Sequence, residues 1–261
     1  MLMYGGKNFC YTPVMEVNSK QFLYLPFKRT NYQITEGWRY SEEEKNIHGV
    51  SGHGGIDFSV PRGTEVLSAA DGWAIASYYW QPLKNQDGSL RTFKDKEIGM
   101  GLGYFVQIYH PQENLYTSYG HLDRVSEKIP FHRPIERNGV FWPVGHKVKP
   151  ENLPHYKYAK FVKTGEELGF VGYSGLTWGY RDYPQRPDPN KYTSWDEAHL
   201  HFEVFNRIGS RGNKKYFDPF GIKSNFNDYP DSDRLNNRKN MGTKSFVLWL
   251  TDQEGMPQFS K

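Results

Sequence analysis

Two short stretches far apart in the chain carry side chains whose types suit a zinc ion that activates water. The first runs from His53 through two glycines and an isoleucine to Asp57, and the second is His199-Leu-His201. Catalytic zinc takes imidazole and carboxylate ligands and keeps one position open for water or substrate. His53, Asp57 and one of the two later histidines meet this requirement, so the sequence predicts a zinc site with the chemistry of a hydrolase.

The spacing within each stretch predicts that both lie on strands. Side chains alternate between the two faces of a strand, so His199 and His201 should point the same way, with Glu203 behind them. Glu203 is therefore a candidate to orient a zinc ligand. The glycines of the first stretch and the proline after it favour an extended or bulged strand over a helix.

A third candidate lies between these stretches. Residues 115–122 are rich in strand-forming side chains and end in His121 and a leucine. Alternation predicts His121 on the same face as Leu115, Thr117 and Tyr119. We expect His121 to be a histidine that faces the metal without binding it.

Five blocks of the chain resemble, in order, the successive blocks of the lysostaphin/LytM-type zinc endopeptidases. They are HGGIDFSVPRGTEVLSAADG (53–72), GLGYFVQIYH (101–110), YTSYGHL (116–122), VKTGEELGFVGYSG (162–175) and HLHFEV (199–204). The resemblance covers about residues 35–221. It implies a mostly β fold of the duplicated-hybrid-motif type, with a compact antiparallel β-sheet core, a β-sandwich or barrel, and long loop insertions.

The resemblance also assigns roles to residues. It implies that His53, Asp57 and His201 hold one Zn²⁺ per chain, and that His121 and His199 are the catalytic pair. Members of this family usually cut peptide cross-links in bacterial peptidoglycan. The implied activity is that of a metallopeptidase whose partner is peptidoglycan or a cell-wall peptide, and the implied location is extracytoplasmic, periplasmic or secreted.

The chain departs from the family pattern at two insertions. One covers residues 176–198 and carries several aromatic residues, of which Trp178, Tyr180 and Trp195 are predicted to contact the substrate. The other covers residues 126–160. Loops of this length tend to be functional or disordered, although the aromatic residues would serve equally well to cover the edges of the core.

Composition excludes some classes of protein. The net charge of the 261 residues is only +4, with no basic stripe of the kind that nucleic-acid binding needs. Cys10 is the single cysteine, so no internal disulfide can form. No run approaches the roughly 20 apolar residues of a membrane span, and the first ten residues lack the apolar core of a signal peptide. We therefore expect this numbering to begin at a processed or trimmed form.

Strand-like segments recur along the chain and are separated by Gly, Pro, Asp or Asn, which predicts a mostly β fold. These segments are 22–27, 64–69, 73–79, 104–109, 115–119, 167–171, 199–205 and 245–250. We expect an N-terminal extension packing on the core (1–30), a zinc metallopeptidase domain (31–221) and a C-terminal extension with one further strand-like segment (222–261).

Two other functions stay open on the sequence. One is a cell-wall-binding or regulatory module on the same fold with weak or lost catalysis, although such a module is expected to lack some of the five metal and catalytic residues. The other is a zinc hydrolase of a peptide outside the wall.

Gly99, Gly101 and Gly103 precede a strand and open no helix, so they form no dinucleotide-binding fingerprint.

Overall fold

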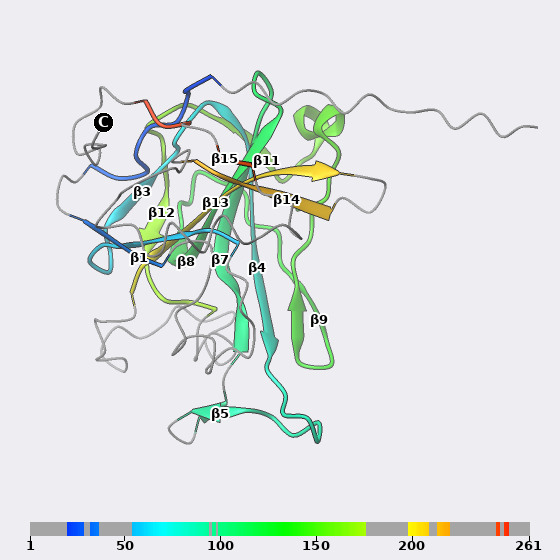
Figure 1. Ribbon diagram of the computed structural model, residues 1–261. Coiled ribbons are helices and arrows are strands. Elements are labelled where there is room, and N and C mark those ends of the chain that lie inside the picture. Colours follow the sequence, from blue (N-terminus) through cyan, green and yellow to red (C-terminus); the bar gives the residue numbers. More distant parts are fainter. Residues whose placement is uncertain are drawn as a thin grey trace, which may run out of the picture.

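The computed structural model consists mainly of antiparallel β-strands (Figure 1). The described residues are 20–28, 32–36, 54–93, 96–97, 99–175, 198–208, 213–219, 244–245 and 248–250. The elements are β1 (Gln33–Glu36), β2 (Ile56–Ser59), β3 (Glu65–Leu67), β4 (Gly72–Pro82), β5 (Thr92–Phe93), β6 (Lys96–Glu97), β7 (Gly99–His110), β8 (Leu115–Val125), β9 (Ile135–Arg137), β10 (Val140–Trp142), the 3-10 helix η1 (Pro150–His155), β11 (Ala159–Val162), β12 (Glu167–Val171), β13 (Leu200–Ile208), β14 (Asn213–Asp218) and β15 (Lys244–Ser245).

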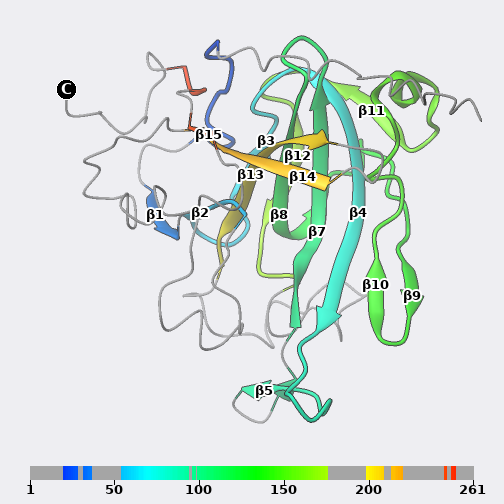
Figure 2. The same cartoon turned by 45° about the vertical axis from the view of Figure 1, so that its right-hand side comes forward.

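Most of these strands join one branched sheet in the order β1-β2-β13-β8-β7-β4-β10-β9. The strand β12 pairs with both β8 and β3, β11 pairs with β4, and β14 pairs with β13. The long strands β4, β7 and β8 run side by side, whereas β13 and β14 cross them at a large angle because the sheet is strongly twisted (Figures 1 and 2). The prediction of a mostly β, antiparallel fold is confirmed.

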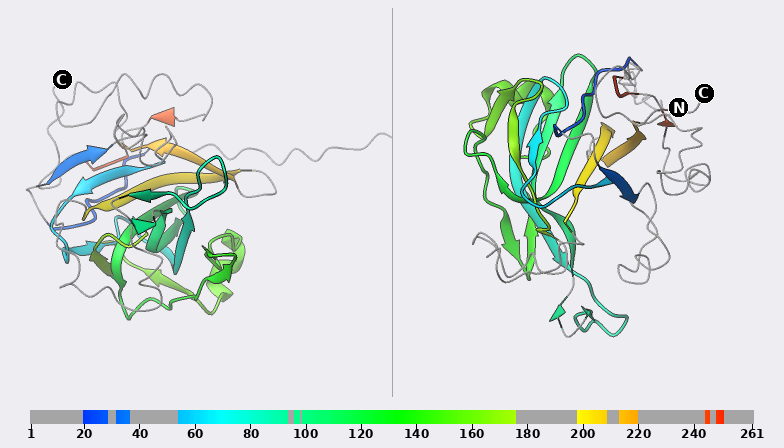
Figure 3. Two further views of the ribbon diagram at one scale, coloured as in Figure 1. Left: turned by 90° about the horizontal axis from the view of Figure 1, so that it is seen from below. Right: turned by 90° about the vertical axis from the view of Figure 1, so that its left-hand side faces the viewer.

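The hydrophobic core lies on one face of this twisted sheet. Phe202 of β13 is buried there, and its ring centroid lies 5.3 Å from that of Tyr119 on β8 and 5.2 Å from that of Trp249. The same cluster includes apolar side chains of β2, β4 and β7. Figure 3 shows how the twist brings β1, β2 and β13 across the green and cyan strands that complete the core. Leu200, Phe202 and Val204 of β13 therefore point into this core, whereas His201 and Glu203, which alternate with them, do not belong to it.

Segments from both ends of the described chain complete the core. Leu23 pairs with Trp249 in an isolated parallel bridge, and both side chains are fully buried. The backbone N–H groups of Phe22 and Leu23 donate to the carbonyl oxygen of Leu248. Residues 22–27 are thus buried in part, but they form a single bridge followed by a bend where the sequence predicted a strand. The predicted domain boundaries stay a prediction.

The insertion at residues 126–160 is ordered structure within the fold. It contains the hairpin of β9 and β10, which extends the sheet beside β4, and the short helix η1 (Figure 2). Ile135 and Trp142 lie opposite each other in this hairpin, and their side chains are 47% and 46% exposed. The sequence predicted a long insertion here but no strand.

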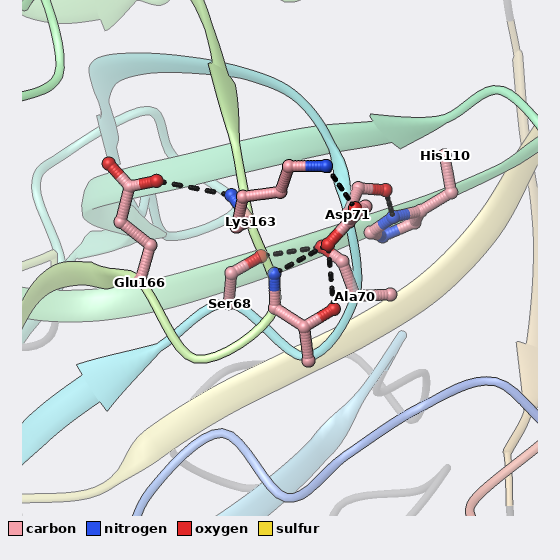
Figure 4. A network of polar contacts seen from close by, with 7 residues as sticks. Ser68, Ala70, Asp71, His110, Lys163 and Glu166 are labelled. Atoms are coloured by element: carbon pink, nitrogen blue, oxygen red, sulfur yellow. Dashed lines mark hydrogen bonds and ion pairs between the residues drawn. The ribbon is translucent and has the colours of Figure 1, made fainter.

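The corner between β3 and β4 is tied to the turn between β11 and β12 by a polar network (Figure 4). The Asp71 carboxylate accepts hydrogen bonds from Lys163 Nζ and from the backbone N–H and hydroxyl of Thr164. The hydrogen bond from Lys163, followed by those from Thr164, lowers the pKa of Asp71 to about 2. His110 Nδ1 lies 2.8 Å from the Asp71 carbonyl oxygen, so the network also reaches the end of β7.

In the part of the chain that the structure describes, no helix is both long and apolar enough to cross a membrane.

Candidate functional site

Asp57 and His201 lie side by side at the centre of the candidate site. They are directly opposite each other in the antiparallel pair of β2 and β13. His201 Nδ1 lies 2.9 Å from Asp57 Oδ1, and both side chains are buried. A Cβ atom at Gly55 would lie 2.8 Å from two atoms of the His201 ring, so the chain can pass this close to the imidazole only where residue 55 has no side chain.

His199 and His121 complete a cluster of three imidazoles around Asp57. The His121 ring centroid lies 4.7 Å from that of His199 and 5.5 Å from that of His201. His199 Nε2 lies 3.6 Å from Asp57 Oδ2. His199 stands just before β13, where it forms an isolated bridge with Gly172. The structure therefore brings together four of the five residues predicted to bind metal or act in catalysis, while the fifth, His53, lies outside the described residues.

The placement of His121 on its strand differs from the prediction. Tyr119 packs against Phe202 in the core, whereas His121 faces His199 and His201 on the opposite side of β13. Alternation predicted Tyr119 and His121 on one face, and that prediction was wrong.

A β-bulge explains the difference. Along β7 and β8, Val106 pairs with Tyr119 and Tyr104 pairs with Leu122, so one residue of β7 stands against two of β8. His121 is one of those two and has a left-handed backbone with φ of 59°. This conformation costs a residue with a side chain about 1–2 kcal/mol. Bulges redirect side chains next to active sites, and this one turns the imidazole out of the core and into the site.

Glu203 links the site to a second charged residue. Its Oε1 lies 3.6 Å from His201 Nε2, and its Oε2 accepts a hydrogen bond from Lys214 Nζ on β14. The Glu203 side chain is 5% exposed and that of Lys214 is 22% exposed. The carboxylate therefore lies between the imidazole and the ammonium group, away from water.

These contacts shift the pKa values of the buried groups. Burial lowers the pKa of His121 well below its usual value, and the neighbouring His199 and His201 add to this effect, so its imidazole is neutral. Burial also lowers the pKa of His201, but Asp57 and Glu203 outweigh it and raise that pKa to about 9. Burial raises the pKa of Glu203, whereas Lys214 and His201 together bring it down to about 2, so this carboxylate is charged.

The donor chemistry of this cluster fits zinc. Imidazole nitrogen and carboxylate oxygen are its usual protein ligands besides thiolate, and Asp57 and His201 offer one of each at 2.9 Å from each other. Among the residues that the structure describes, no group of three or more His, Cys, Asp or Glu side chains is arranged to hold a metal ion. The predicted third ligand, His53, is not among those residues.

Some residues predicted from the sequence could not be placed, and others were missed. Trp178, Tyr180 and Trp195, predicted to contact the substrate, lie outside the described residues. Lys214 was missed because no motif marks β14. Ser174, whose carbonyl oxygen lies 2.8 Å from His121 Nδ1, was also missed, although its place between two glycines in the Gly-Tyr-Ser-Gly turn was a usable signal.

Comparison with known proteins gives matches among solved structures alone. No family model matches the chain, and no curated protein matches it. One similar structure is the catalytic domain of the prophage-encoded M23 protein EnpA from Enterococcus faecalis, at 18% identity and a TM-score of 0.36, covering 73% of this chain and 92% of that one. A zinc-containing peptidase from Vibrio cholerae matches at 22% identity and a TM-score of 0.36, covering 71% of this chain and 36% of that one.

The antimicrobial peptidase lysostaphin from Staphylococcus simulans matches at 15% identity and a TM-score of 0.37, covering 75% of this chain and 51% of that one. The chain therefore spans about a third of the Vibrio peptidase and about half of lysostaphin.

Proposed function

We propose that this protein is a zinc-dependent endopeptidase that hydrolyses amide bonds, and that its substrates are the peptide cross-links of bacterial peptidoglycan. The observation that carries the proposal is the convergence of Asp57, His121, His199 and His201 from β2, β8 and the start of β13 into one cluster. Imidazole and carboxylate groups brought together in this way are the ligand and acid–base types that a hydrolytic zinc centre uses, which supports the proposal.

Asp57 and His201, together with His53, would hold the metal. Gly54, next to His53 in the chain, lies against the ring of Tyr216, and Gly55 lies against the ring of His201. The chain therefore passes the His201 ring at Gly55, two positions after His53 in the sequence. Bound zinc would supply an activated water at neutral pH and polarise the carbonyl group of the substrate.

His121 and His199 would move the protons of the reaction. Hydrolysis of an amide requires that a proton leave the attacking water and that another reach the leaving amine. A neutral imidazole can accept the first, and an imidazolium can donate the second. The His121 and His199 rings are 4.7 Å apart, so both can serve one scissile bond.

Glu203 would orient the His201 ring through its contact with Nε2. Histidine ligands of a metal usually direct their second nitrogen at a carboxylate or carbonyl group, which fixes the ring orientation. His201 has Nδ1 near Asp57 and Nε2 near Glu203, an arrangement of this kind. Glu203 is therefore proposed as a positioning residue, not as a catalytic one.

Purified peptidoglycan tests the proposal directly. The zinc-loaded protein should release peptides whose masses identify cleavage within cross-links. Elemental analysis should find about one zinc per chain, and both Asp57→Ala and His201→Ala should lose it. If both variants kept their zinc, the ligand assignment would be wrong.

A variant of His121 separates binding of the metal from catalysis. His121→Ala should retain zinc but lose about 10²- to 10⁴-fold in rate, the usual contribution of a general acid or base. Binding to peptidoglycan without cleavage would instead support the wall-binding module, and cleavage of other peptides alone would support a hydrolase with a substrate outside the wall. An enzyme that acts on the wall works outside the cytoplasm, which is the location that we propose.

A further inference from the structure

Ser174 fastens the turn after β12 to two strands of the sheet. Its side chain is 1% exposed. The Ser174 hydroxyl donates a hydrogen bond to the carbonyl oxygen of Leu122 on β8 and accepts one from the backbone N–H of Tyr104 on β7, at 2.8 Å. One hydroxyl thus bridges β7 and β8 at the Tyr104–Leu122 pair, which forms one end of the bulge that contains His121.

Two glycines allow the turn to lie this close to β7. A Cβ atom at Gly103 would lie 2.2 Å from the carbonyl carbon of Ser174, and one at Gly175 would lie 2.1 Å from the nitrogen of Gly103. Both glycines have a left-handed backbone, with φ of 60° and 79°. Side chains at these positions would push the turn off the strand, so the contact depends on the bare backbone as well as on the Ser174 hydroxyl.

A partly buried ion pair holds the same turn from its other side. The Arg62 guanidinium binds the Asp123 carboxylate and lies 4.4 Å from the ring centroid of Tyr173. A Cβ atom at Gly172 would meet Asp123 Oδ1 at 2.1 Å, so the carboxylate presses against the backbone of the turn. The position of residues 172–175 is therefore fixed from both sides.

The fixed turn presents one backbone oxygen to His121. The Ser174 carbonyl oxygen lies 2.8 Å from His121 Nδ1. A carbonyl oxygen can only accept a hydrogen bond, so Nδ1 must carry the hydrogen. In the neutral ring the lone pair is then on Nε2. Nε2 is therefore the nitrogen of His121 that can accept a proton in the site.

We propose that Ser174 is a positioning residue that fixes His121 in its Nδ1–H tautomer and so leaves Nε2 to accept the proton. The Ser174 hydroxyl does not touch the reacting atoms; it acts by holding its own carbonyl group under the imidazole. The consequence for catalysis rests on the proposed peptidase function, whereas the tautomer is a property of the folded chain and can be measured without any substrate.

Long-range ¹H–¹⁵N correlation spectra of the zinc-loaded protein test the tautomer directly. At a pH where the ring is neutral, His121 should show its hydrogen on Nδ1 in the wild-type protein. In Ser174→Ala the fraction of this tautomer should fall, and kcat should fall about 10- to 100-fold, as is usual when a partner that orients a catalytic group is lost. KM and the zinc content should stay unchanged.

Ser77 offers a matched control. Its hydroxyl is buried, donates to the carbonyl oxygen of His132 and accepts from the N–H of Val144, so Ser77→Ala loses the same kinds of hydrogen bond away from the site. This variant should keep both the His121 tautomer and kcat.

Two results would overturn the inference. One is a wild-type His121 with its hydrogen on Nε2, a measurement that needs no variant and so stands even if Ser174→Ala fails to fold. The other is a folded Ser174→Ala with unchanged tautomer and kcat. A protein that has the Nδ1–H tautomer but cleaves no peptide would contradict the proposed function and leave the tautomer assignment intact.

Discussion

Lys214 lies where the loss of a single positive charge should destabilise the protein strongly. Its Nζ donates to Glu203 Oε2 and lies 4.4 Å from the ring centroid of Phe205. Lys214→Met keeps the packing of the side chain on that ring but leaves a 5%-exposed carboxylate without its cation. Breaking a buried pair in this way costs about 3–5 kcal/mol. Because His201 lies 3.6 Å from the same carboxylate and offsets part of its charge, we expect the lower end, about 3 kcal/mol.

Urea unfolding of matched variants measures this cost. In the exposed pair of Lys149 and Glu151 the charges are 4.0 Å apart and the side chains are 76% and 66% exposed. Lys149→Met should therefore change the free energy of unfolding by less than about 1 kcal/mol. Adding Glu203→Gln to Lys214→Met removes the uncompensated charge and should recover part of the loss. If Lys214→Met cost no more than Lys149→Met, the pair would not be the buried interaction argued for.

Three further outcomes follow from the structure and the sequence. Burial lowers the pKa of His110 from 6.5 to about 4, so the stability that its neutral ring contributes is complete above about pH 6.5 and is lost as the pH falls toward 4. His110→Gln should therefore flatten the pH dependence of unfolding in this window. Phe202→Ala should cost about 3–5 kcal/mol in urea unfolding, since it empties the middle of an aromatic cluster; a cost below about 1 kcal/mol would show that this cluster collapses around the gap. Replacing Trp178 and Trp195 together by alanine should raise KM for peptidoglycan fragments without loss of zinc, and unchanged kinetics would remove the loop at 176–198 from the substrate site.

The fold class followed from local patterns, because strands with one buried face must alternate apolar and polar side chains. The pattern of β13 placed Phe202 in the core and His201 on the other face, as the structure shows. The hairpin of β9 and β10 escaped prediction because both strands are three residues long and their side chains are mostly exposed. Such short exposed strands leave no periodicity to detect.

The candidate site was predictable in its residues but less so in its geometry. Asp57, His199 and His201 were found from spacing, but His121 was assigned to the wrong face because alternation assumes an unbroken strand. Gly120 directly before it was the available signal, since an isolated glycine in a strand often marks a bulge. Lys214 could not have been found, because its contact with Glu203 depends on how β14 pairs with β13.

The bridge between Leu23 and Trp249 has a consequence for how the chain reaches its native state. It joins residues more than two hundred positions apart, and Trp249 packs against Phe202 and Phe58 in the middle of the core. Contacts of such long sequence separation form slowly, since a large loop must close before they stabilise anything. During synthesis, the aromatic side chains of β2 and β13 that Trp249 covers in the native state stay exposed to solvent until residue 249 has left the ribosome. We therefore expect nascent chains that stop short of this tryptophan to be held by chaperones or to aggregate, and the last step of folding to be the docking of residues 248–250.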